Sequence, residues 1–93
     1  MNSEGTLREM QTAIEVELVT RDGCHLCDIA AALLRSAARD LPLRVVTRDV
    51  DADPELLHLY DLRVPVVIAG GREICEGVFT PGDLRRGLLG AAA

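Results

Sequence analysis

The chain has 93 residues, 48% of them hydrophobic and 27% charged, which is an ordinary composition for one small globular domain. Its 10 Lys and Arg against 15 Asp and Glu give a net charge of −5, which argues against nucleic acid or anionic lipid as a main partner because phosphate binding needs a basic surface. No apolar run approaches the roughly 18 residues that a membrane span requires. We therefore expect a soluble domain, with no nucleic acid and no membrane as partner.

The N-terminal segment, MNSEGTLREMQT, is polar and lacks the basic and apolar regions of a secretory signal. We expect residues 1–12 to form a flexible tail, residues 13–93 to form the folded domain, and the protein to be cytoplasmic. Structural disulfides are rare in a reducing cytoplasm, so the three cysteines indicate redox chemistry or metal binding instead.

Hydrophobic periodicity predicts the elements of the first half of the domain. Residues 13–20 alternate apolar and polar side chains, which is typical of a half-covered strand. Apolar side chains then recur every four residues, as in an amphipathic helix, until Pro42 ends the pattern. Residues 43–51 are rich in β-branched side chains and predict a second strand. Asp53 and Pro54 then fit the N-cap and first residue of a short helix.

The second half predicts a hairpin and a final helix. Two apolar runs are divided by Gly70 and Gly71, which supply the positive φ angles of a tight turn. Thr80 and Asp83 fit a capping box that begins the last helix. The order is β-α-β-α-β-β-α. A strand-helix-strand start implies a right-handed crossover and a parallel pair, so we predict an α/β fold with a four-stranded mixed sheet and helices on both faces.

The stretch GCHLCD contains two cysteines, Cys24 and Cys27, between the first strand and the first helix. Cys24 is therefore expected at the helix N-terminus, where free backbone N–H groups and the helix dipole favour a thiolate. Such placements lower a cysteine pKa from about 8.5 to roughly 3.5–7.5. Cys27 lies one turn further into the helix, so we expect it to be better shielded and to be the resolving thiol. Its sulfur is within reach of Cys24, because residues three apart share a helix face.

Four charged neighbours act on Cys24 in opposite directions. Arg21 and His25 would stabilise a negative charge, whereas Asp22 and Asp28 would oppose it, so we expect a moderate lowering of the pKa. His25 is expected to face solvent. It is either an intervening residue or an imidazolium that tunes the thiolate.

Over residues 13–90 the sequence resembles the glutaredoxin-like branch of the thioredoxin superfamily. The matching features are RDGCHLC after a strand, DVDADPEL, Val64-Pro65, and Gly70-Gly71 in the hairpin. The resemblance implies a thioredoxin-like fold in which Pro65 is cis and lies against the cysteines, although only about 5–6% of X-Pro bonds are cis. It also implies that the backbone of Val64 pairs with a bound peptide or glutathione. Alternatively, Pro65 merely begins an edge strand.

The same resemblance implies a disulfide oxidoreductase, in which Cys24 attacks a protein disulfide or a glutathione mixed disulfide and Cys27 releases the reduced product. The expected partners are disulfide-containing or glutathionylated proteins. We expect a monomer with no metal and no tightly bound cofactor, and with glutathione or a thioredoxin-type reductase as the reductant. The predicted catalytic residues are Cys24 and Cys27, and the predicted substrate-binding residues are Arg21, His25, Val64 and Pro65.

The sequence also departs from the family pattern. His25 and Leu26 replace the usual Pro-Tyr between the cysteines, and a longer loop follows Cys75 where glutathione-binding members carry a Gly-Gly-Cys-Asp-Asp-like segment. There is also no Trp before the first cysteine, unlike thioredoxins proper. The identity of the reductant therefore stays open. Cys75 itself is interpreted as a small core side chain, with an extra redox thiol as the alternative.

Two other function classes stay open. The first is metal or iron–sulfur binding: one paired-cysteine motif falls short of the four ligands of a structural zinc site, but a cluster bridged between two chains with glutathione fits the resemblance. The second is a redox-silent adaptor that binds partners through the groove at Val64 and Pro65. The intact cysteine pair argues against the adaptor, which has no need of both thiols.

Overall fold

The computed structural model describes residues 13–92, so the tail predicted at residues 1–12 lies outside the described part of the chain. Its elements follow the predicted order β-α-β-α-β-β-α, with one added 3-10 turn, η1. They are β1 (Ile14–Thr20), α2 (His25–Ala37), β2 (Leu43–Asp49), η1 (Val50–Ala52), α3 (Pro54–Tyr60), β3 (Val66–Ala69), β4 (Arg72–Glu76) and α4 (Pro81–Ala92).

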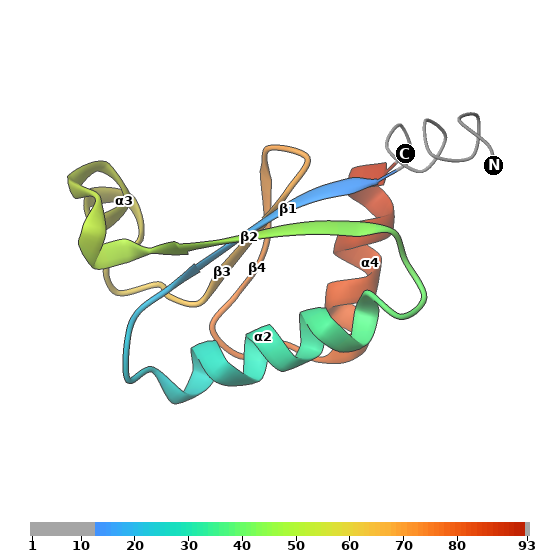
Figure 1. The fold of residues 1–93 in the computed structure, drawn as a ribbon, viewed down its shortest axis with the longest axis horizontal. Coiled ribbons are helices and arrows are strands. Elements are labelled where there is room, and N and C mark those ends of the chain that lie inside the picture. The colour runs from blue at the N-terminus through green and yellow to red at the C-terminus, as the bar shows by residue number, and fades with distance from the viewer. Residues whose placement is uncertain (1–12, 93) are drawn as a thin grey trace, which may run out of the picture.

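The four strands form one mixed sheet in the order β2-β1-β3-β4 (Figure 1). β1 and β2 pair in parallel, and the crossover helix α2 connects them. β3 pairs antiparallel with both β1 and β4. The predicted thioredoxin-like α/β sheet is confirmed. Because β3 is a central strand, the alternative that Pro65 begins an edge strand is wrong.

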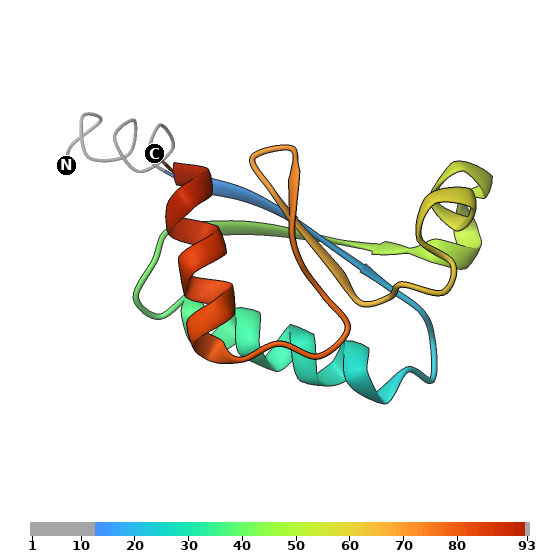
Figure 2. The same ribbon diagram turned by 180° about the vertical axis from the view of Figure 1, so that it is seen from behind.

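Helices lie on both faces of the sheet, but they cover them unequally (Figures 1 and 2). α2 and α4 cover one face above the main core, whose largest members are Leu18, Leu34, Leu84 and Leu88. α3 covers only one end of the other face, where Tyr60 packs on Val19, Val50 and Val66. Within residues 13–92, no helix has the length and apolar character that crossing a bilayer requires.

Two predicted boundaries are wrong by a few residues. The strand predicted over residues 43–51 ends at Asp49, because the Asp49 side chain accepts the N–H of Asp51 at 2.9 Å and so begins η1. The helix predicted to run to Pro42 ends at Ala37. Beyond it the N–H groups of Arg39 and Asp40 bond three residues back, which tightens the chain into a turn before Pro42.

The predicted hairpin and capping box are confirmed. Gly70 and Gly71 connect β3 to β4 with φ values of +59° and +80°, the positive values that a two-residue turn of type I′ requires. At the start of α4, the Asp83 N–H donates to Thr80 Oγ1 and the Thr80 N–H donates to the Asp83 carboxylate, each at 3.0 Å. These contacts fix the β3–β4 turn and the start of α4.

Candidate redox site

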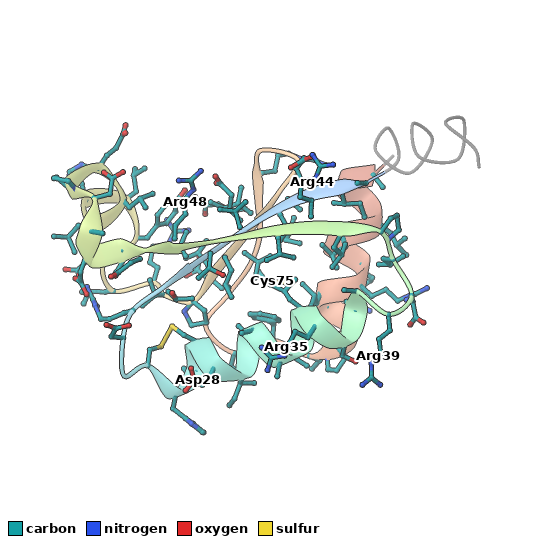
Figure 3. The ribbon with its side chains drawn as sticks, viewed as in Figure 1. Asp28, Arg35, Arg39, Arg44, Arg48 and Cys75 are labelled. Atoms are coloured by element: carbon teal, nitrogen blue, oxygen red, sulfur yellow. A yellow bond between two sulfur atoms is a disulfide. The ribbon has the colours of Figure 1, made fainter. Side chains whose placement is uncertain are left out.

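Cys24 and Cys27 lie where the chain passes from β1 into α2, and they form a disulfide (Figure 3). Their Cα atoms are 5.2 Å apart, within the usual range for a disulfide. The turn between β1 and α2 contains Gly23 with a φ of +74°, which glycine adopts without steric cost. Cys24 follows as the N-cap of α2, so its predicted place at the helix N-terminus is confirmed.

The two sulfurs differ in exposure and in hydrogen bonding. Cys24 is half-buried, and its Sγ accepts the backbone N–H of Cys27 at 3.1 Å. Cys27 is only 3% exposed, so solvent and large substrates reach Cys24 first. When the pair is reduced, the amide and the helix dipole would stabilise a thiolate at Cys24. The arrangement therefore separates an accessible nucleophile from a shielded second thiol.

Charged side chains next to the disulfide are exposed. Asp28 lies in the first turn of α2, beside the disulfide (Figure 3). His25 and Asp22 are exposed too, and the solvent-facing position predicted for His25 is confirmed. A ligand at Cys24 would therefore meet these side chains in a solvated setting.

Arg21 is bound to two carboxylates. It donates from Nε and Nη2 to both carboxylate oxygens of Asp51, at 2.9 and 3.0 Å. It also donates to the Asp61 backbone C=O at 3.0 Å and to the Asp61 carboxylate at 2.6 Å. The hydrogen bonds to Asp51 and then Asp61 raise the pKa of Arg21, and the same contact lowers the pKa of Asp51. Arg21 therefore joins the cysteine loop to η1 and to the segment that follows α3.

The Val64–Pro65 peptide bond is cis, as the resemblance implies. Pro65 is buried, and its C=O accepts the N–H of Gly77 at 2.9 Å. Val64 is half-buried, and its N–H and C=O have no backbone partner within residues 13–92. Among residues 13–92, the backbone of Val64 therefore has unused hydrogen-bonding groups.

Arg63, for which the sequence predicted no role, lies directly before Val64, and its side chain is held by β4. Its guanidinium pairs with Glu73 and, at 2.8 Å, with Glu76, both on β4. It also lies 5.3 Å from the ring centroid of Tyr60. Hydrogen bonds to Glu76 and, to a smaller extent, to Glu73 raise the pKa of Arg63. The hydrogen bond from Arg63 lowers the pKa of Glu76. The sequence signal that could have indicated this pairing is a basic residue beside Val64-Pro65 together with two acidic residues on the predicted hairpin.

Cys75 stands apart from the redox pair. It lies on β4, on the face of the sheet that α2 and α4 cover (Figure 3), and it packs against the main core. Burial is the main cause that raises its pKa, with a smaller effect of the negative charge on Asp83. This placement agrees with the interpretation of Cys75 as a core side chain.

The described residues of one chain do not form a set of metal ligands. Between residues 13 and 92, no group of three or more His, Cys, Asp or Glu side chains is placed to hold a metal ion. A cluster shared between two chains would take its ligands from both, so that alternative stays a hypothesis.

Residues 15–89 match the family model of the Glutaredoxin-like domain (DUF836). The chain belongs to this family. The glutaredoxin-like domain thus covers every element from β1 to α4 except the ends of the outermost ones, in agreement with the resemblance over residues 13–90.

Curated relatives of this glutaredoxin-like chain include an uncharacterized protein of Mycobacterium tuberculosis and one of Mycobacterium bovis. Each is 38% identical over 64 residues, which cover 63% of this chain. The chain spans 66% of the length of these relatives.

Solved structures share the fold. A structural genomics target protein from X. campestris is 36% identical with a TM-score of 0.69, covering 81% of this chain and 96% of that one. Protein Ne2328 from Nitrosomonas europaea is 27% identical with a TM-score of 0.71, covering 81% and 91%. A mutant thioredoxin from Halobacterium salinarum covers 100% of this chain and 87% of its own, at a TM-score of 0.68, and its 18% identity shows the fold alone. Together with the cysteine pair at disulfide distance, the family and the fold support a redox thiol function.

Proposed function

We propose that this protein is a thiol-disulfide oxidoreductase that uses Cys24 and Cys27 to reduce disulfides of other proteins or glutathione mixed disulfides. The observation that carries the proposal is the asymmetry of the pair. Cys24 is accessible at the N-cap of α2 and accepts an amide hydrogen bond, whereas Cys27 is 3% exposed one turn further on. A nucleophilic thiol needs access and a lowered proton affinity, and a resolving thiol needs only to reach the first sulfur.

The reaction begins when the Cys24 thiolate attacks one sulfur of the substrate disulfide. That disulfide breaks, its other sulfur leaves as a thiolate, and a mixed disulfide forms on Cys24. The Cys27 thiol then loses its proton to the leaving group and attacks the Cys24 sulfur. The second substrate sulfur leaves as a thiolate and takes a proton from solvent, so the substrate ends as two thiols. The protein, two electrons poorer, ends with the Cys24–Cys27 disulfide. Glutathione or a thioredoxin-type reductase would return those two electrons.

Two arginines support this role by holding the segment around Val64. Arg21 binds Asp61 before it, and Arg63 binds β4 beside it. The backbone of Val64, free within the described residues, would then pair with the substrate peptide next to its disulfide. In this proposal Arg21 positions the site through its carboxylate partners.

Trapping the mixed disulfide tests the proposal. In a Cys27→Ser variant, combined with Cys75→Ser to remove the third thiol, the second step is blocked and the substrate should stay bound to Cys24. Mass spectrometry after incubation with glutathione disulfide and with a peptide disulfide should show one adduct, removed by dithiothreitol. The matched Cys24→Ser, Cys75→Ser variant should form far less adduct, because Cys27 is buried. No adduct with either compound would favour the redox-silent adaptor.

A further inference from the structure

Exposed apolar side chains border one side of the redox site. Leu26 lies between the two cysteines and is 39% exposed, Ile29 is 44% exposed, and Val78 is 81% exposed. Together with Ala30, Leu33, Gly77 and Phe79 they line a hollow of about 50 Å³, here called the apolar groove. The hollow exceeds the roughly 10–15 Å³ that one water molecule occupies, so the groove accepts a small aliphatic side chain.

The apolar groove begins beside the redox site in the chain. Its α2 wall begins at Leu26, directly before Cys27. Its other wall is the loop that joins β4 to α4 and runs beside α2 (Figure 2). The first residue of this loop, Gly77, donates its N–H to the C=O of Pro65, so the groove is tied to the segment that carries the free Val64 backbone. A peptide bonded to the Val64 backbone would therefore lie near the wall of the groove that Gly77 forms.

The charges around the site disfavour glutathione. Glutathione carries two carboxylates and one ammonium group, so a site that selects it needs unpaired cations. Arg21 and Arg63 are each shared between two carboxylates, so each cluster has a net charge of −1. Asp22 and Asp28 add exposed negative charge on either side of the cysteines. An anionic tripeptide therefore meets like charge here, and repulsion of this kind is a means of excluding a competing ligand.

From the groove, its walls at Leu26 between the cysteines and at Gly77 bonded to Pro65, and the paired cations, we propose that the preferred substrate is a protein disulfide whose cysteine neighbours an aliphatic residue. This inference rests on the proposed function and narrows it. The aliphatic side chain enters the apolar groove while the peptide backbone lies along Val64. Cys24 attacks the sulfur of that peptide cysteine, and the groove holds the peptide until Cys27 releases it as a thiol.

Single-turnover kinetics with matched substrates test the inference. The substrates are mixed disulfides with thionitrobenzoate: a peptide with Leu next to its cysteine, the same peptide with Ser there, and glutathione. Attack of Cys24 on the peptide or glutathione sulfur breaks each S–S bond and releases the same coloured thiolate. The protein is a reduced Cys75→Ser variant in excess, so it supplies both electrons itself. We expect the Leu peptide to react about tenfold faster than the Ser peptide and faster than glutathione.

Variants locate the preference in the groove. Val78→Ser, at an 81% exposed position that leaves the core intact, should remove most of the tenfold difference between the Leu and Ser peptides. The matched control Leu89→Ser, 45% exposed on α4 and absent from the groove lining, should preserve it. Equal rates for both peptides, or a faster reaction with glutathione, would overturn the inference while leaving the proposed function intact. No release from any of the three substrates would overturn the proposed function itself.

Discussion

The three cysteines of this chain have different surroundings. Cys24 is half-exposed and accepts an amide hydrogen bond at the start of a helix. Cys27 is 3% exposed beside it. Cys75 packs against the main core, where burial raises its pKa. Thiolate nucleophiles are stabilised by nearby N–H donors and suppressed by apolar surroundings, so the thiols of the reduced protein should differ in reactivity.

We predict that iodoacetamide at pH 7 modifies Cys24 first, at least about tenfold faster than Cys75. A raised pKa leaves Cys75 with less thiolate at this pH, and its burial limits access as well. The measurement is the rate of modification of each cysteine by peptide mass spectrometry, starting from the fully reduced protein. In concentrated urea the ratio should approach one, because the unfolded chain removes the differences in surroundings. Equal rates in the folded protein would contradict the assignment of Cys24 as the nucleophile.

α4 packs closely against β4 where Gly87 meets Ile74. An ideal Cβ built on Gly87 would lie 2.8 Å from Cβ of Ile74 and 2.9 Å from its Cδ1. Real Cβ atoms do not approach that closely, so the absence of a side chain at this position allows α4 to pack against the strand. Part of that contact involves the inflexible base of the Ile74 side chain, which cannot move without the strand.

We therefore predict that Gly87→Ala lowers the free energy of unfolding by about 1–3 kcal/mol, the usual effect of overpacking a core contact. Gly90→Ala is the matched control on the same helix, because a Cβ there would meet no atom within 4 Å. It should be neutral or stabilising by up to about 1 kcal/mol, since alanine is the better helix former. Urea unfolding of both variants measures the difference. A loss of similar size at both positions would show that the Ile74 contact is not the cause.

The elements also show what the sequence could and could not predict. Strand alternation, the Gly70-Gly71 turn and the N-cap at Cys24 depend on short stretches, so their local patterns were sufficient. The partners of Arg21 were not predictable, since Asp51 and Asp61 lie 30 and 40 residues further along the chain. The apolar groove also depends on how the β4–α4 loop folds back onto α2, which no local pattern specifies.

The charge of the whole molecule is organised into ion pairs as well as into a net value of −5. On the part of the sheet that α3 leaves open, Arg44 pairs with Glu15 at 3.2 Å and Arg48 with Glu17 at 2.8 Å. Arg44 and Arg48 lie on the side of β2 away from α2 and α4 (Figure 3). Exposed pairs of this kind each contribute about 0–1 kcal/mol.

Acid titration of stability tests three other carboxylates, whose pKa values hydrogen bonds lower. Hydrogen bonds from Arg21, Arg63 and Thr80 are the main causes that lower the pKa values of Asp51, Glu76 and Asp83, respectively. Their ordinary values are 3.8 for Asp and 4.5 for Glu, so below about pH 4.5 the unfolded chain binds more protons than the folded one. The stabilisation is complete above that pH and is lost as the pH falls through the lower folded-state values.

We predict that the urea midpoint, measured from pH 7 to pH 2, is level down to about pH 5 and then falls. Asp83→Asn should start from a lower midpoint at pH 7, because the variant loses the charged partner of the Thr80 N–H and of Arg86. It should also fall less steeply on acidification, since one of the three shifted carboxyls is gone. A midpoint that rises between pH 5 and pH 3, or an unchanged slope in the variant, would contradict the assignment of these carboxylates as stabilising in their ionised form.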